Sequence, residues 1–160
     1  MTVCLRPVEP GDDPFLEWLR RPEVTGEFNS FDEPLPPGNQ AADRMVVALD
    51  DGTPVGVVSW FAVSYGPNLG SRAWNMGITI APGHRRKGYG AAAQRLLADH
   101  LLSTTEANRV EASTDVENVA EQRALERAGF RREGVARGAQ FRRSRWHDLV
   151  IYARLRDDPS

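Results

Sequence analysis

Three consecutive segments of the chain could together bind a pyrophosphate. Residues Trp74–Ile80 predict an extended strand, Ala81–Lys87 form a turn rich in proline, glycine and basic side chains, and a helix is expected to begin at Gly88. The first N–H groups of a helix have no partner within it, and the helix dipole favours negative charge there. Gly88 and Gly90 lack Cβ, so a phosphate can approach the backbone closely. The turn therefore predicts an anion site, with positive charge beside it from Arg85, Arg86 and Lys87.

The elements that position this turn follow from hydrophobic spacing. The helix after Gly88 carries an apolar face with i, i+3, i+4 and i+7 spacing: Tyr89, Ala92, Ala93, Leu96, Leu97 and Leu101. Strands are expected at Val3–Val8, Arg44–Leu49, Val55–Tyr65, Trp74–Ile80, Arg109–Thr114, Phe130–Val135 and Ser144–Leu155. An early helix with Phe15, Trp18 and Leu19 on one face precedes Pro22, and a later one ends at Gly129. The order β-α-loop-βββ-α-β-α-ββ predicts an α/β protein with a right-handed parallel crossover.

Composition restricts the classes of protein that the chain can represent. It has 160 residues, of which 41% are hydrophobic and 26% charged, so we expect one domain over residues 1–160. A net charge of −2 and a pI near 5.9 argue against a general nucleic-acid or membrane-surface binder. Cys4, expected in the core, is the only cysteine, which excludes intramolecular disulfides and cysteine-based zinc sites. No apolar run approaches the roughly 18 residues of a membrane span. We expect a cytoplasmic protein without a metal.

The turn also resembles a known family motif. Arg85-x-x-Gly88-x-Gly90 after a strand is similar to the Arg/Gln-x-x-Gly-x-Gly/Ala motif of the GNAT superfamily, the acyl-CoA-dependent N-acetyltransferases. In that family the amides of the turn hold the pyrophosphate of CoA. The order of elements also resembles the GNAT fold over essentially the whole chain. The resemblance implies a single mixed, mostly antiparallel central sheet flanked by helices.

A second stretch strengthens the resemblance. Residues 115–130 are similar to the family pattern Asn-x-x-Ser-x-x-x-Leu-Glu-Lys-x-Gly-Phe, with Asn118 at the position of the Asn. In the Rim-type branch, the ribosomal-protein N-terminal acetyltransferases, that Asn bonds the pantetheine arm of CoA. Trp146-x-Asp148-x-x-x-Tyr152 also resembles that branch. The residues that the resemblance and the turn together assign to acetyl-CoA are Ile78, Thr79, Ile80, Arg85, Arg86, Lys87, Gly88, Tyr89, Gly90, Ala91 and Asn118.

Two catalytic positions differ from the family pattern. Many Rim-type relatives carry Glu where this strand has Asn75, which cannot take a proton at neutral pH but can orient an amine or a water. The family Ser is Glu121 here, which puts the usual hydroxyl proton donor in doubt. Asn118 and Glu121 also have the spacing of a capping box, in which they would satisfy backbone amides reciprocally.

The spacing of the residues does not identify the general base that would take a proton from the acceptor amine. Residues 22–43 are acidic, contain no Lys or Arg, and are interrupted by prolines, so they are either a solvated loop or a wall that attracts a cationic amine. Within it, Glu33 is the catalytic candidate, alongside Glu27 and Asp32. Glu111 and His147 are further candidates. Transfer by positioning and a water relay is equally compatible with the sequence.

The chain is therefore expected to move an acetyl group from acetyl-CoA to a primary amine, on a peptide N-terminus or a small amino-bearing metabolite or antibiotic. A homodimer through the C-terminal strands is expected by family analogy. The alternatives are a catalytically silent GNAT-like module that holds CoA, and an RNA-associated protein that uses the arginines at 131, 132, 137, 142, 143 and 145. The acidic pI favours a solvated hairpin face over RNA binding, so no nucleic-acid partner is expected.

Overall fold

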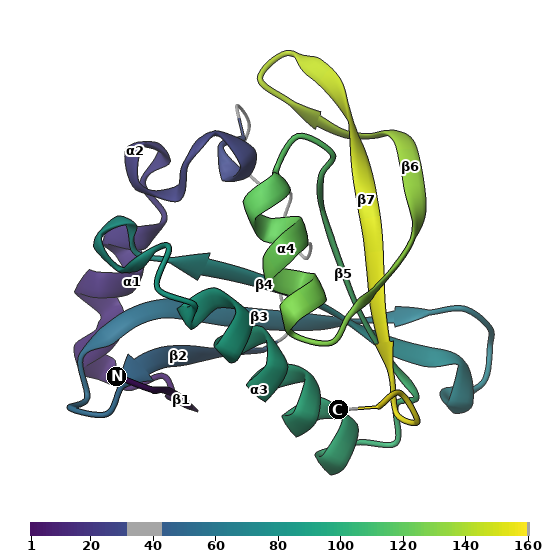
Figure 1. Ribbon diagram of the computed structural model, residues 1–160, viewed down its shortest axis with the longest axis horizontal. Coiled ribbons are helices and arrows are strands. Elements are labelled where there is room, and N and C mark those ends of the chain that lie inside the picture. Colours follow the sequence, from purple (N-terminus) through teal and green to yellow (C-terminus); the bar gives the residue numbers. More distant parts are fainter. Residues whose placement is uncertain (32–42, 160) are drawn as a thin grey trace.

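Seven strands form one sheet in the order β1-β2-β3-β4-β5-β7-β6, in a computed structural model that describes residues 1–31 and 43–159 (Figure 1). The strands are β1 (Val3–Pro7), β2 (Asp43–Leu49), β3 (Pro54–Ser64), β4 (Arg72–Ile80), β5 (Arg109–Asp115), β6 (Arg131–Arg142) and β7 (Arg145–Leu155). The α-helices are α1 (Asp13–Leu19), α2 (Pro22–Thr25), α3 (Tyr89–Thr104) and α4 (Val119–Arg127). Short 3-10 helices are η1 (Pro10–Asp12), η2 (Glu27–Asn29), η3 (Leu69–Ser71) and η4 (Pro82–His84).

One pair of neighbouring strands differs from the others in direction. β4 and β5 are parallel, whereas the remaining neighbours are antiparallel. The connection between β4 and β5 runs through α3, as the strand–helix–strand order predicts. The predicted α/β class, with a single mixed and mostly antiparallel sheet flanked by helices, is confirmed.

The sheet splits between β4 and β5. These strands are paired at only two positions, Trp74 with Val110 and Asn75 with Glu111. Beyond them, β4 continues to Ile80 beside β3, and β5 continues to Asp115 beside β7. The backbone groups that β4 and β5 turn toward each other past Asn75 and Glu111 are therefore not bonded across the sheet.

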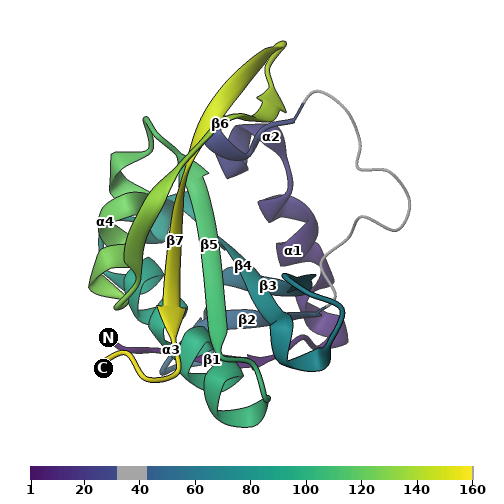
Figure 2. The ribbon, with the colours of Figure 1, turned by 90° about the vertical axis from the view of Figure 1, so that its right-hand side faces the viewer.

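Helices cover both faces of the sheet (Figure 2). α3 and α4 lie on one face, called here the α3 face, and α1 and α2 lie on the other, called the α1 face. The larger hydrophobic core fills the α3 face and includes Leu97, Val110 and Tyr152, each with no exposed surface. A smaller cluster on the α1 face joins Leu16 and Leu19 to the start of the turn after β4 at Ala81.

The buried stripe of α3 is rotated from the predicted one. Leu96, expected in the core, is 39% exposed, whereas Gln94 is fully buried. The buried stripe consists of two rows with i, i+4 spacing. One row is Ala93, Leu97 and Leu101, and the other is Gln94, Ala98 and Leu102. Leu96 lies outside both rows because each residue turns about 100° around the helix.

Two N-terminal side chains are exposed. Trp18, predicted on one helix face with Phe15 and Leu19, is 37% exposed and lies beside Phe15 with the ring centroids 6.0 Å apart and the rings tilted, whereas Leu16 and Leu19 are buried. Cys4 lies on the outer side of the edge strand β1 and is exposed. Pro22 ends α1 as predicted and also begins α2.

The C-terminal hairpin is longer than the sequence predicted. β6 extends through the segment expected to be an Arg- and Gly-rich turn, with a register irregularity between Ala136 and Gln140. The turn itself is only Arg143 and Ser144, whose φ angles of 53° and 63° suit a two-residue hairpin connection. The hairpin therefore reaches beyond the rest of the sheet (Figure 1).

Two variants of α3 test which side of the helix is buried. Leu97→Ala should lower the free energy of unfolding by about 2–5 kcal/mol, because Leu97 has no exposed surface and its truncation opens a cavity in the core. Leu96→Ala on the same helix should change it by less than about 1 kcal/mol. Urea unfolding followed by circular dichroism measures both. Equal losses would show that the predicted face, not the observed one, is buried.

Candidate active site

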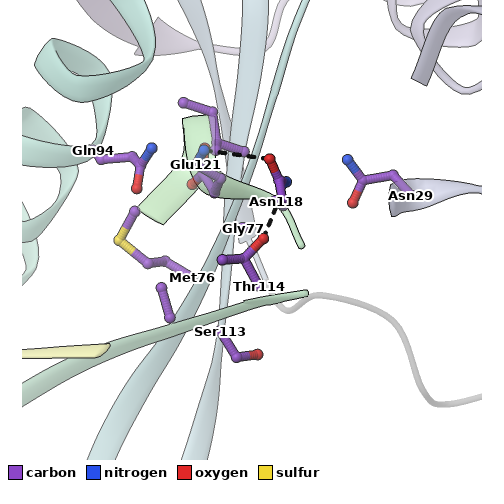
Figure 3. Close-up of a pocket in the computed structure, with 10 residues that line it drawn as sticks. Asn29, Met76, Gly77, Gln94, Ser113, Thr114, Asn118 and Glu121 are labelled. Carbon is purple, nitrogen blue, oxygen red and sulfur yellow. Dashed lines mark hydrogen bonds between the residues drawn. The ribbon is translucent and has the colours of Figure 1, made fainter. Parts of the chain in front are cut away.

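A cavity of about 100 Å³ lies in the split between β4 and β5 (Figure 3). Its walls are the separated parts of the two strands, the second turn of α3, the start of α4, and η2. The lining residues are Asn29, Met76, Gly77, Ile78, Gln94, Ala112, Ser113, Thr114, Asn118 and Glu121. Of the strand residues expected to contact acetyl-CoA, Ile78 lines the cavity, and Thr79 and Ile80 follow on β4.

Lining residues come from both faces of the sheet. Gln94 of α3 and Glu121 of α4 belong to the α3 face, and Asn29 of η2 belongs to the α1 face. Gln94 and Asn29 lie at opposite ends of the group in Figure 3. The cavity therefore passes between the strands, and molecules that approach from the two faces can meet in it.

The start of α3 has the features of an anion site. Its N-cap, Gly88, is left-handed with φ of 81°, and no side chain of the described residues caps the helix. The first helical bond runs from the Ala92 amide to the Gly88 carbonyl, so the amides of Tyr89, Gly90 and Ala91 are directed out of the helix start. A Cβ at Gly90 would approach Ile80 at 3.8 Å. These residues fit a phosphate, which requires free amides and room at the backbone.

Arg85 is bonded to the protein backbone. Its Nε donates to the carbonyl of Ile80 at 2.8 Å, and its Nη2 donates to the carbonyl of Val24 at 2.7 Å. The side chain therefore ties α2 to the end of β4 and fixes the turn. Arg86, with φ of 61°, and Lys87 are exposed on the same turn.

Asn118 is the N-cap of α4, as predicted. Its Oδ1 accepts from the Glu121 amide at 3.3 Å, and its Nδ2 donates to Thr114 Oγ1 at 3.1 Å. The capping box also predicts a bond from the backbone amide of Asn118 to the side chain of Glu121, and this prediction is wrong. The Asn118 amide donates to the carbonyl of Asp115 at 2.9 Å instead. The carboxyl of Glu121 is directed into the cavity instead.

Glu121 has an unusual environment for a carboxyl group. Burial raises the pKa of Glu121 from its ordinary value of 4.5 to about 7. No Arg or Lys of the described residues forms an ion pair with it. The carboxamide of Gln94 is near and offsets part of the rise, yet neither of its polar atoms has a partner in hydrogen-bonding geometry within residues 1–31 and 43–159. A carboxyl with a raised pKa beside an unpartnered buried amide is typical of functional sites.

Asn75 lies on the α1 face at the point where β4 and β5 begin to separate. It does not line the cavity; its Nδ2 donates to Oε1 of Glu111 at 3.4 Å. Glu111 is buried and also accepts from Tyr65 at 2.5 Å and from Nε of Arg109 at 2.8 Å. The sequence did not predict this cluster, because Tyr65, at the end of an expected strand, is 46 residues away from Glu111 in the chain.

The acidic loop is described in part. Glu33 and Asp32 lie outside the described residues. Glu27, which is described, is 3.8 Å from Nη1 of Arg143 at the tip of the β6–β7 hairpin. The acidic loop and the Arg-rich hairpin therefore meet on the α1 face.

A buried ionic cluster anchors that hairpin. Asp115 accepts from Arg142 at 2.7 Å, and its carboxylate lies 3.1 Å from His147. The guanidinium of Arg142 also lies over the ring of Phe28, which precedes Asn29 of the cavity. The prediction of a solvated arginine face is thus wrong for Arg142, which is only 3% exposed. An arginine this deep needs a paired carboxylate, and the sequence offered no sign that Asp115 would supply it.

Three polar residues of β7 have structural partners. His147, one of the candidate bases, is buried in the ionic cluster. Asp148 accepts from the backbone amide of Gly138 at 2.7 Å, as a backbone-holding residue should. Tyr152 is a core residue, and its hydroxyl donates to Glu126.

Comparison with known proteins identifies the family. Residues 2–131 match the family described as "Acetyltransferase (GNAT) domain". The chain therefore belongs to the GNAT family, a family of acyltransferases, as its motifs predicted.

Curated relatives of the chain are named as N-acetyltransferases. The chain is 29% identical over 113 residues to the probable N-acetyltransferase YjcK of Bacillus subtilis strain 168, a match that covers 71% of this chain and 61% of that relative. It is 25% identical to the uncharacterized N-acetyltransferase p20 of Bacillus licheniformis, over 96% of this chain and 93% of that one. The chain thus spans less than two thirds of the length of the first of these relatives.

Solved structures share the fold. The spermidine N-acetyltransferase of Vibrio cholerae, determined with CoA and spermine, superposes with a TM-score of 0.81 over 98% of this chain and 97% of that one, at 22% identity. An acetyltransferase of the GNAT family from Bacillus anthracis gives a TM-score of 0.77 at 20% identity, over 98% and 96% of the two chains. At these identities the likeness establishes the GNAT fold.

No helix in residues 1–31 and 43–159 is long and apolar enough to cross a membrane. In the same part of the chain, no group of three or more His, Cys, Asp or Glu side chains could hold a metal ion.

The raised pKa of Glu121 predicts a pH-dependent cost in stability. The folded protein holds this proton up to about pH 7, and the unfolded chain releases it near 4.5, so stability should fall as pH rises from 4.5 to 7. Glu121→Gln removes the ionisation. It should raise the free energy of unfolding at pH 8 by roughly 2–3 kcal/mol, or the unfolding midpoint by roughly 4–9 °C, and have little effect near pH 4.5. Calorimetric melting at both pH values measures this.

The exposed Glu106 supplies the control, since Glu106→Gln should show no such gain between the two pH values. If Glu121→Gln gives the same shift at pH 4.5 and pH 8, the buried carboxyl does not titrate as described.

Proposed function

We propose that the chain is an acetyl-CoA-dependent N-acetyltransferase that moves the acetyl group to a primary amine by direct attack in a ternary complex. The observation that carries this proposal is the cavity that passes through the split, because it is lined from both faces of the sheet. A donor held on the α3 face and an amine held on the α1 face would meet there without a covalent enzyme intermediate. Bringing two reactants together in line removes several kcal/mol of the barrier.

The donor side would be held by the turn and helix start described above. The amides of Tyr89, Gly90 and Ala91 would bind the pyrophosphate, with Arg86 and Lys87 adding positive charge. Arg85 would act by fixing the turn. Ile78, Thr79, Ile80 and Asn118 would lie along the pantetheine arm. Acetyl-CoA supplies an activated thioester when it is bound.

The residues around the thioester would each have a distinct task. A backbone N–H of β4 near Ile78–Ile80 would polarise the carbonyl, because this edge of β4 is not bonded to β5. Glu121, protonated in part at neutral pH, would donate a proton to the departing sulfur, replacing the family hydroxyl. Asn75 would orient groups on the α1 face. Glu33 stays a candidate for the acceptor side.

The acceptor would be a primary amine, on a peptide N-terminus or a small amino-bearing metabolite or antibiotic. The Vibrio cholerae neighbour was determined with spermine, an amine of this general kind. The finer resemblance to the Rim-type branch, through Asn118 and Trp146-x-Asp148-x-x-x-Tyr152, favours a peptide N-terminus. A cytoplasmic location and a homodimer through the C-terminal strands belong to the same proposal.

A catalytically silent CoA-binding module is the second candidate. The observation that favours it is the amide of Asn75 at the position where many Rim-type relatives carry a glutamate, since an amide cannot accept a proton at neutral pH. Both candidates require the donor site, and only the first requires transfer.

Donor binding is tested by Gly90→Glu. A glutamate at Gly90 should repel and crowd the pyrophosphate, while a Cβ there meets only Ile80 at 3.8 Å, so the fold should persist. Calorimetric titration with acetyl-CoA should give micromolar affinity for the wild type and at least a 30-fold loss in the variant. Gly11→Glu adds the same charge where a Cβ meets nothing within 4 Å and should bind as the wild type does. Equal affinity of Gly90→Glu and the wild type would place the donor elsewhere.

Transfer is tested by the release of free thiol. The wild type with acetyl-CoA should release CoA faster in the presence of at least one amine from a panel of alaninamide, spermidine, free amino acids and an aminoglycoside than in buffer alone. Mass spectrometry of that amine should show one added acetyl group. Tight binding of acetyl-CoA without acceleration by these amines would favour the silent module.

A further inference from the structure

The carboxylate of Glu111 occupies a special position in the sheet. It is the register partner of Asn75, and this pair is the last one before β4 and β5 separate. Across the sheet, Phe61 pairs with Asn75 and Ala153 pairs with Glu111, so the four residues form one row on the α1 face. Glu111 therefore lies at the closed end of the split that contains the cavity.

The next residues on the same face are part of the cavity wall. Gly77 and Ser113 lie two positions beyond Asn75 and Glu111 and line the cavity. Two residues of a strand span about 6.6 Å. One water molecule with two hydrogen bonds of about 2.8 Å each bridges most of that distance. A group over Gly77 and Ser113 is thus within one water of Glu111.

The groups around Glu111 leave one of its oxygens available. Oε2 accepts from the hydroxyl of Tyr65 and from Nε of Arg109. Oε1 accepts only the long bond of 3.4 Å from Asn75 among the described residues. The hydrogen bond to Glu111 raises the pKa of Tyr65, so the phenol remains a donor in the neutral range. The carboxylate is held in orientation with Oε1 as its free acceptor.

The charge of Arg109 is shared with a second carboxylate. Nη1 and Nη2 of Arg109 donate to Glu133 at 2.9 and 2.7 Å, and only its Nε serves Glu111. Arg109 is thus shared between two carboxylates, and most of its donors serve Glu133. The charged groups that face Glu111 in the described structure are Arg109 and, through it, Glu133.

We propose that Glu111 on β5 takes up the proton of the acceptor amine through a bridging water, and that Asn75 and Tyr65 orient it. The catalytic carboxylate would then stand one strand away from the position at which the family resemblance leads one to expect it. This inference rests on the proposed function. In the step, the amine nitrogen attacks the thioester carbonyl carbon, a C–N bond forms, the C–S bond breaks and the sulfur keeps the electron pair. The nitrogen's proton passes to Oε1 of Glu111 and then to solvent, and the sulfur gains a proton from Glu121.

The test moves the carboxylate between the two strands. With acetyl-CoA and alaninamide at pH 7, Glu111→Gln should lower kcat/KM by about 100-fold or more. Adding Asn75→Glu to that variant returns a carboxylate to the same row and should recover at least tenfold. Glu133→Gln removes the other partner of Arg109 and should change kcat/KM by less than about threefold. Glu111→Asp, which keeps the charge beside Arg109, guards against a variant that does not fold.

The pH profile separates a base from a structural ion pair. An α-amine has a pKa near ~8, so it is largely neutral at pH 9.5 without help. The deficit of Glu111→Gln should therefore shrink at least tenfold between pH 7 and pH 9.5. The affinity for acetyl-CoA by calorimetry should be unchanged within about twofold.

The results of these experiments separate the role of Glu111 from the proposed function. A wild type that acetylates an amine of the panel of alaninamide, spermidine, free amino acids and an aminoglycoside, with Glu111→Gln equally active, overturns the role of Glu111 and leaves the proposed function standing. A deficit that is the same at every pH, with no recovery by Asn75→Glu, also overturns it, because a structural ion pair would behave so. A wild type that transfers acetyl to no amine of that panel overturns the proposed function and this inference together.

Discussion

The separation of β4 and β5 is the constraint on which the rest of the structure depends. A parallel pair that opens after two positions leaves backbone donors and acceptors without their usual partners, which is costly unless something else meets them. The fold confines this cost to one place, since β3 and β7 stay paired to the outer sides of the two strands. The helix starts of α3 and α4 then lie beside the opening. The opening, the uncapped amides and the cavity are thus parts of one arrangement.

The two faces of the opening differ in electrostatics. On the α3 face, Glu121 and Gln94 are buried without a counter-charge among the described residues, so the local environment favours neutral groups. On the α1 face, the carboxyl of Glu111 accepts hydrogen bonds from Arg109 and Tyr65. A proton donor and a proton acceptor on opposite faces suit a reaction in which a nitrogen loses a proton and a sulfur gains one.

Sequence reasoning predicted the parts of the site that depend on local spacing. The turn at Gly88 and Gly90, the α4 cap at Asn118 and the order of elements follow from neighbours in the chain, and the structure has them where they were expected. The contacts that could not be predicted join residues far apart in sequence. Asn75 meets Glu111 only because the register of two strands aligns them.

Burial was the other quantity that the sequence misjudged. Arg142 was assigned to a solvated face because arginine is usually exposed, and its pairing with Asp115 depends on where the hairpin crosses the end of β5. Leu96 was assigned to the core because the spacing of leucines alone fixes the apolar stripe only to within one residue around the helix. Both errors arise because local patterns describe periodicity and not which side of an element faces its neighbours.

The way the hairpin tip contacts η2 has a consequence for how such proteins diverge. The wall on the α1 face is built by Phe28 and Asn29 together with Arg142, whereas the phosphate turn and α4 are encoded between these segments in the chain. Substitutions in the first and last parts of the chain can therefore change the wall on the α1 face without changing the wall on the α3 face. A lineage can change what enters from one side while it inherits the opposite side intact.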